Sequence, residues 1–131
     1  MPFPLTLGPT GTLQTSIFLS FAFTSAGLFT FVSPSHPDVF GLPAETTTPV
    51  WSLQGVRDLT MGVAYGLLAW QRNYAGTKAL MTAHVITGVV DAAVVWEYGK
   101  KAKMWGHAAG TTVMATVVAG WWLNGGEGVH I

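Results

Sequence analysis

Three charged residues and two histidines lie inside long apolar stretches of this chain, where side chains of these types can transfer protons. Arg57 and Asp58 are adjacent in one stretch, His84 and Asp91 lie in the next, and His107 lies near the start of the last. Carboxylates and imidazoles are common general acids and bases, and a guanidinium stabilises negative charge that develops during a reaction. These residue types therefore predict acid/base chemistry in an apolar setting.

The elements that carry these residues have the length of membrane-spanning helices, about 20 residues for a hydrocarbon core of roughly 30 Å. The four apolar stretches cover approximately residues 11–33, 50–70, 77–98 and 103–123. The connector 34–49 contains four prolines, which prevent a helix from continuing through it. The sequence predicts an all-α protein, with residues 1–131 forming a single integral membrane domain built as a four-transmembrane-helix bundle.

The composition favours lipid as the solvent. Only 9% of the 131 residues are charged and 50% are apolar, whereas soluble domains carry about 25% charged residues. The net charge is zero, which provides no electrostatic surface for nucleic acid, and we expect no such partner. The chain has no cysteine and no nucleotide-binding or hydrolase motif, and its histidines lack the dense spacing of a metal-binding bundle. We expect neither a metal nor another cofactor.

Tryptophans mark the ends of the predicted spans, as expected where hydrocarbon meets lipid headgroups. All six lie near such ends: Trp51, Trp70, Trp96, Trp105, Trp121 and Trp122. We call side A the side with both chain ends and the 71–76 turn, and side B the side with the connector and the 99–101 turn. Side B has three lysines near the membrane against two basic residues on side A, which places side B in the cytoplasm.

The intramembrane charges need partners, because three unpaired central charges would together cost about 8–10 kcal/mol. Alternate spans run in opposite directions, so most of these groups converge on the half of the bilayer near side B. Adjacent residues point about 100° apart on a helix. We therefore expect Arg57 to pair with Asp91 or Glu97 rather than with Asp58. Such a pair could also serve only to lock two helices together.

Small and polar residues at intervals of three and four predict the inward faces of the bundle. The four stripes are Ser16, Ser20 and Thr24; Gln54, Asp58, Gly62, Tyr65 and Gly66; His84, Thr87, Gly88 and Asp91; and His107, Thr111, Ala115 and Ala119. Gly62 and Gly66 are spaced for close helix packing. His84 also fits a core histidine bonded to a neighbouring helix, and Glu97 fits a side chain that extends to the membrane surface.

Short motifs run from the connector to the last span: Phe40-Gly41, then Gly55-Val56-Arg57-Asp58, and later Asp91 and His107 on separate spans. On these motifs the chain resembles a family of small four-helix membrane proteins of fungi and some bacteria, catalogued only as a domain of unknown function. No activity of that family can be transferred. The resemblance implies a setting beside polyketide or terpenoid pathways, and the endoplasmic reticulum as location if the source is a fungus.

The first functional hypothesis is a cofactor-independent cyclase or isomerase that acts on a lipophilic small molecule, such as a polyketide or terpenoid intermediate, by cyclisation, isomerisation or epoxide opening. Asp58 would be the general acid and Asp91, paired with Arg57, the base, or the reverse. His107 would relay protons or orient the substrate. The residues expected to bind substrate are Gln54, Tyr65, Thr87, Glu97 and His84.

Two further hypotheses stay open. A proton-coupled transporter or channel subunit would use the intramembrane acids to carry protons, and a structural or assembly protein would use the ion pair to fix helix register. Because a unit this small has little interior volume, we also expect a homo-oligomer with the Ala/Gly-rich face of the 103–123 span at the contact.

Overall fold

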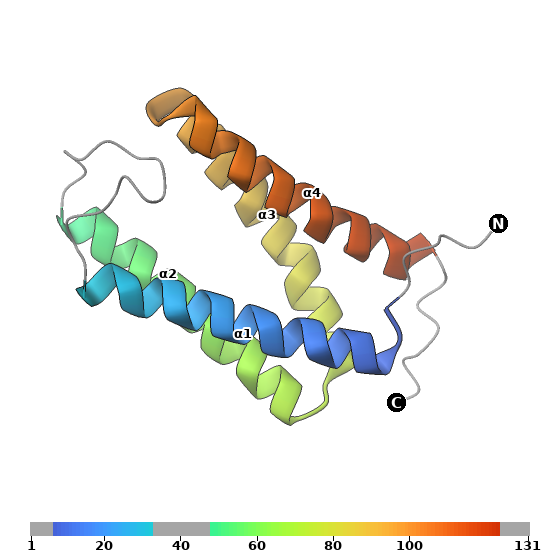
Figure 1. The fold of residues 1–131 in the computed structure, drawn as a ribbon. Coiled ribbons are helices and arrows are strands. Elements are labelled where there is room, and N and C mark those ends of the chain that lie inside the picture. The colour runs from blue at the N-terminus through green and yellow to red at the C-terminus, as the bar shows by residue number, and fades with distance from the viewer. Residues whose placement is uncertain (1–6, 33–47, 124–131) are drawn as a thin grey trace.

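The computed structural model describes residues 7–32 and 48–123, and within 48–51 only the backbone. The described chain forms four helices and no strand: α1 (Pro9–Val32), α2 (Thr48–Trp70), α3 (Tyr74–Tyr98) and α4 (Lys101–Leu123) (Figure 1). The predicted all-α fold is confirmed, and each predicted span matches a helix to within about one turn. The motif Phe40-Gly41 and most of the connector lie outside the described residues.

Two of the helices, α1 and α3, are long and apolar enough to cross a membrane. The helices α2 and α4 have similar lengths but do not reach the same apolarity. Arg57 and Asp58 lower the apolarity of α2, and Lys101, Lys103 and His107 lower that of α4. By length and composition, therefore, two of the four predicted spans are supported.

The helices form two antiparallel pairs, α1 with α2 and α3 with α4 (Figure 1). The start of α1, the α2–α3 turn and the end of α4 lie at one end of the molecule, which is side A, and the pairs diverge toward side B (Figure 1). Arg72, in the turn that follows α2, has a left-handed φ of 50°. Asn73 then caps α3, because its side chain accepts a hydrogen bond of 2.8 Å from the Gly76 amide.

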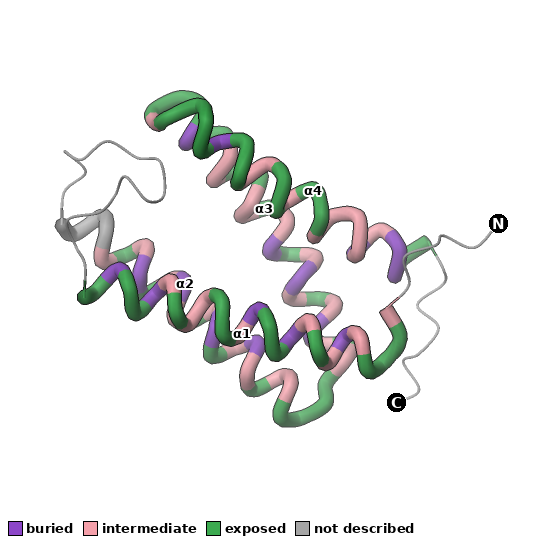
Figure 2. Tube along the Cα trace, viewed as in Figure 1, coloured by how far each residue is buried: buried purple, intermediate pink, exposed green. Residues whose placement is uncertain are grey.

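The apolar cluster that joins the two helix pairs is small and lies toward side A, whereas the buried Val95 and Met104 lie on α3 and α4 in the side-B half. Figure 2 shows buried positions on the facing sides of the helices and exposed positions along their outer sides. The core side chains come from all four helices: Leu19, Tyr65, Met81, Val118 and Trp121. Because apolar packing joins the two pairs at side A, the side-B half depends on other contacts between them.

Four tryptophans are exposed, as expected for side chains at a membrane boundary: Trp70, Trp96, Trp105 and Trp122. Trp121 departs from this prediction, since it is only 3% exposed. Its Nε1 donates a hydrogen bond of 3.2 Å to the Leu7 carbonyl, and the Lys78 ammonium lies 5.5 Å from its ring centroid. Trp121 therefore belongs to the core, and the Trp51 side chain lies outside the described residues.

The α1–α2 pair packs through small residues, as the spacing of Gly62 and Gly66 predicted. A Cβ on Gly62 would collide with Thr24, and one on Gly66 would lie 2.9 Å from the Ser20 hydroxyl. Farther along, a Cβ on Gly27 would lie 2.6 Å from the Leu59 backbone nitrogen. The backbones of α1 and α2 therefore approach each other too closely to admit side chains at these glycines.

A Gly62→Ala variant should therefore be less stable than the wild type by about 1–3 kcal/mol, because the added methyl group overpacks this contact. The matched control is Gly106→Ala on α4, where no atom lies within 4 Å of the added Cβ. That control should be more stable by about 0.5–1 kcal/mol, since alanine favours the helix. Unfolding of both variants in detergent measures the difference, and equal shifts would contradict the packing described.

Candidate functional site

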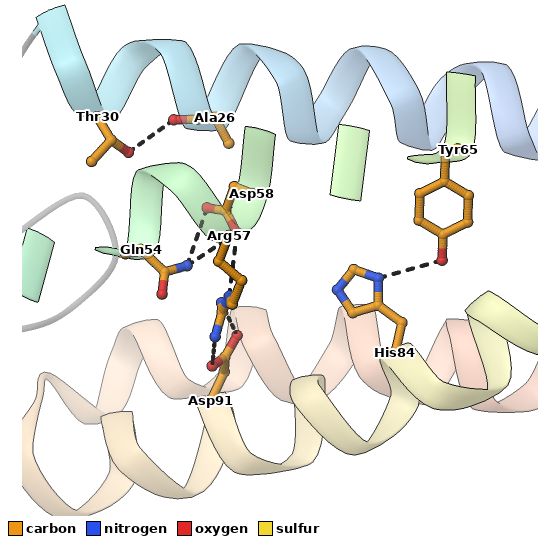
Figure 3. A network of polar contacts seen from close by, with 8 residues as sticks. All are labelled: Ala26, Thr30, Gln54, Arg57, Asp58, Tyr65, His84 and Asp91. Atoms are coloured by element: carbon orange, nitrogen blue, oxygen red, sulfur yellow. Dashed lines mark hydrogen bonds and ion pairs between the residues drawn. The ribbon is translucent and has the colours of Figure 1, made fainter. Parts of the chain in front are cut away.

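A bidentate ion pair joins α2 to α3 in the side-B half. The Nη1 of Arg57 donates to Oδ1 of Asp91 at 3.0 Å, and Nη2 donates to Oδ2 at 2.9 Å (Figure 3). This two-bond geometry is the strong form of the arginine–carboxylate pair. Of the two predicted partners of Arg57, the structure selects Asp91. Glu97 is exposed near the end of α3.

Asp58 lies on the α1 side of Arg57, whereas Asp91 lies on the α3 side (Figure 3). The nearest Arg57 contact to Asp58 is Nε to Oδ1 at 3.6 Å. Gln54 Nε2 lies 3.1 Å from both Asp58 oxygens. Asp58 is 4% exposed, so its carboxylate is enclosed between α2 and α1.

A second polar contact joins α2 to α3 nearer side A. The Tyr65 hydroxyl lies 3.3 Å from His84 Nδ1 (Figure 3), and the Phe23 ring stacks on His84 with centroids 4.5 Å apart. Which of the two atoms donates depends on the imidazole tautomer. Tyr65 is fully buried, so its hydroxyl and the Phe23 ring hold the imidazole in a fixed orientation.

A cavity of about 870 Å³ lies between α1, α3 and α4. Its lining is mostly apolar, and the polar side chains in it include three predicted site residues, His84, Asp91 and His107. The complete lining is Leu7, Thr15, Phe18, Leu19, Phe23, Met81, His84, Gly88, Asp91, Lys103, Gly106, His107, Gly110, Thr111, Val113, Met114 and Val117. This volume and this polarity are typical of small-molecule sites, which measure about 300–1,000 Å³.

Asp91 and His107 lie at the same level of neighbouring helices. A Cβ on Gly88 would contact the Thr111 side chain, which fixes the register of the antiparallel α3 and α4. Asp91 is three residues beyond Gly88 and His107 four residues before Thr111, so both lie about one turn nearer side B. Because both line the cavity, a carboxylate and an imidazole face one space from two helices.

The other predicted site residues lie outside the cavity lining. Gln54, Asp58 and Arg57 form one polar cluster with Asp91, and Tyr65 contacts the cavity through His84. Thr87 and Glu97 line no part of the cavity. Of the nine predicted site residues, three face the cavity, four more belong to the polar contacts beside it, and Thr87 and Glu97 belong to neither group.

Sequence reasoning missed the cavity wall contributed by α1 and two of the three glycines of α4. Gly106 and Gly110 both line the cavity, and no atom lies within 4 Å of a Cβ built on either. Glycines at this spacing usually indicate close helix packing, so the open space beside Gly106 and Gly110 could not be predicted from the pattern. No group of three or more residues able to hold a metal occurs in the described part of the chain. The histidines His36 and His130 lie outside it.

Residues 20–123 match the model of one protein family, described as a domain of unknown function, DUF4267. The match includes α2, α3, α4 and most of α1, and therefore the ion pair and most of the cavity. No curated protein and no solved structure matches the chain.

Proposed function

The chain belongs to the DUF4267 family, a domain of unknown function, and we propose, from the geometry of the site, that it is a membrane-embedded enzyme that performs acid/base chemistry on a lipophilic small molecule. The observation that carries the proposal is the cavity in which Asp91 and His107 face the same space from α3 and α4. Cyclisation, isomerisation and epoxide opening each take a proton from one substrate atom and give one to another. A carboxylate and an imidazole at one level can supply both transfers, one as the base and the other as the acid.

The exposed surface supports a membrane location. Only 22% of the most apolar window of α1 and 17% of that of α3 is buried inside the protein, whereas core helices of soluble proteins are mostly buried. Large apolar side chains cover the outer faces, among them Phe21, Val32, Leu67 and Ile86. In the proposed arrangement all four helices cross the bilayer, with side B in the cytoplasm.

Access to the cavity is proposed to be lateral, between α1 and α4. Phe18 and Val113 line the cavity and are 69% and 66% exposed, so they also form its rim. Both lie near the middle of their helices, which corresponds to the hydrocarbon region of a bilayer. A lipophilic substrate can therefore enter from the membrane without crossing water.

Asp91 is proposed to accept a proton from one substrate atom, and protonated His107 to donate a proton to another. The proton on Asp91 then passes to His107 across the space that both face, which restores the two groups. Arg57 orients Asp91 through its two hydrogen bonds, which leave the remaining lone pairs of both oxygens for the substrate. His84, fixed by Tyr65, would bond a substrate oxygen. Asp58 helps to hold the guanidinium, so the role first expected for it as general acid passes to His107.

The transport alternative receives less support from the cavity lining. Beyond His84 toward side A the cavity is lined by apolar residues such as Leu19 and Met81 and by Thr15, whose hydroxyl donates to the Gly11 carbonyl of its own helix at 2.8 Å. The buried hydroxyls nearby bond backbone carbonyls, Ser16 that of Tyr65 at 2.9 Å and Thr77 that of Asn73 at 3.1 Å, and neither lines the cavity. A proton path to side A would need polar groups at these positions of the lining.

The proposal is tested by filling the cavity at Gly110. A Gly110→Phe variant should fold normally, because the surrounding space is open, and should lose the small molecule that copurifies in detergent, detected by mass spectrometry. Ala109→Phe is the matched control, since Ala109 is exposed and does not line the cavity. Retention of the same molecule by both variants, or its absence from the wild type, would sink the proposal.

A further inference from the structure

The cavity is elongated along the helix axes. Its α4 wall extends from Lys103 to Val117, which is about 21 Å at 1.5 Å per residue. A lipid acyl chain occupies half of the hydrocarbon core, about 15 Å. The cavity is therefore long enough for one such chain and a polar group at its end.

The lining changes from polar to apolar along this length. The side-B end contains Asp91, Lys103 and His107, and the side-A end contains Leu19, Met81 and Val117. The one hydroxyl on the α1 wall, that of Thr15, bonds its own helix at the Gly11 carbonyl, 2.8 Å away. An occupant must therefore have a polar group at one end and an apolar body at the other.

The charges at the polar end favour an anion. Asp91 is already neutralised by two hydrogen bonds from Arg57. Lys103, by contrast, forms no ion pair with a described residue. The nearby Lys101 is directed elsewhere, because its ammonium lies 4.7 Å from the centroid of the Trp96 ring. Among the described residues that line the cavity, Lys103 therefore supplies a cation for the occupant at the side-B end.

We infer that the cavity binds a single-chain anionic amphiphile, with its acidic headgroup at Lys103 and its chain along Leu19, Met81 and Val117. This inference rests on the proposed function, for which it names the class of substrate. The headgroup then lies at the side-B surface, and the first carbons of the chain pass between Asp91 and His107. Proton transfer would take place on those carbons or on an oxygen attached to them.

The test measures equilibrium binding in nanodiscs, without turnover, by displacement of radiolabelled palmitate. Unlabelled palmitate should compete better than the alcohol and the amine of the same chain length. Lys103→Gln should weaken palmitate binding by about tenfold, as expected for a lost hydrogen bond to a charged group, and leave alcohol binding unchanged. Lys101→Gln is the matched control and should bind palmitate like the wild type.

Two results would overturn the inference: equal competition by the three headgroups, or equal effects of the two lysine variants. Neither result bears on acid/base chemistry. If palmitate fails to bind while Gly110→Phe still removes the copurified molecule, only the substrate class is wrong. If Gly110→Phe retains that molecule, the proposed function itself fails.

Discussion

An Asp91→Asn variant is expected to turn over the copurified lipophilic molecule at least about a hundredfold more slowly than the wild type. A positioned acid or base contributes about 10²–10⁴-fold to rate, and an amide cannot accept the proton. The variant should still fold, because the asparagine oxygen has nearly the same position and can accept one of the Arg57 hydrogen bonds of about 3 Å. Initial rates of product formation, followed by mass spectrometry, measure the change.

Asp58→Asn provides the matched control for this experiment. Asp58 is another carboxylate of the same cluster, but it is enclosed beside Gln54 and does not line the cavity. Its variant should lose less than about tenfold, since it acts only through the position of Arg57. Normal turnover in Asp91→Asn, or a greater loss in Asp58→Asn, would remove Asp91 from the mechanism.

The helices and their ion pair could be predicted from the sequence because the geometry expected of a membrane bundle leaves few choices. Spans of fixed length and alternating direction place Arg57 and Asp91 at one depth, and the cost of an unpaired charge requires a partner. The 100° between neighbours on a helix then excludes Asp58 as the principal partner of Arg57. These constraints depend on lengths and residue types, which are explicit in the sequence.

The same 100° explains why the expected pair of catalytic carboxylates was not found in one cavity. Since Arg57 faces Asp91 on α3, its neighbour Asp58 must face another direction, toward α1. A stripe pattern shows that residues share a face but does not show which helix that face meets. The order of helices around a bundle is a tertiary property, and it decides whether Asp58 or His107 shares a space with Asp91.

The cavity arises because the helices pack together unequally, and the spacing of residues along a helix does not predict this difference. The small residues Ser20 and Thr24 were expected to face the centre of the bundle, but they pack against Gly66 and Gly62 of α2. This close pairing turns a different face of α1, with Phe18 and Phe23, toward α3 and α4. The cavity forms because α1 packs closely against α2 and less closely against α3 and α4. Such a difference depends on which residues of two helices meet, and the pattern along one helix does not show it.

Replacement of Arg57 by methionine is expected to destabilise the protein by about 1–3 kcal/mol, between the costs of breaking an exposed and a buried ion pair. The intermediate value applies because the side chains of Arg57 and Asp91 are 38% and 28% exposed. Asp91 and Asp58 would both lose their cation while remaining between the helices. Unfolding in detergent measures the loss, and Arg72→Met, in the exposed α2–α3 turn, should change stability by less than about 0.5 kcal/mol.

The double variant Arg57→Met/Asp91→Leu separates a helix-locking role from a chemical one. Apolar side chains of similar size often replace a buried ion pair without loss of stability, so the double variant should recover most of the loss seen in Arg57→Met. If the ion pair only joins α2 to α3, a double variant that recovers its stability should also recover the turnover rate of the wild type. If Asp91 accepts a proton from a substrate in the cavity, the refolded double variant remains at the rate of Asp91→Asn. Recovery of stability together with turnover would therefore favour the structural role and exclude Asp91 as the base.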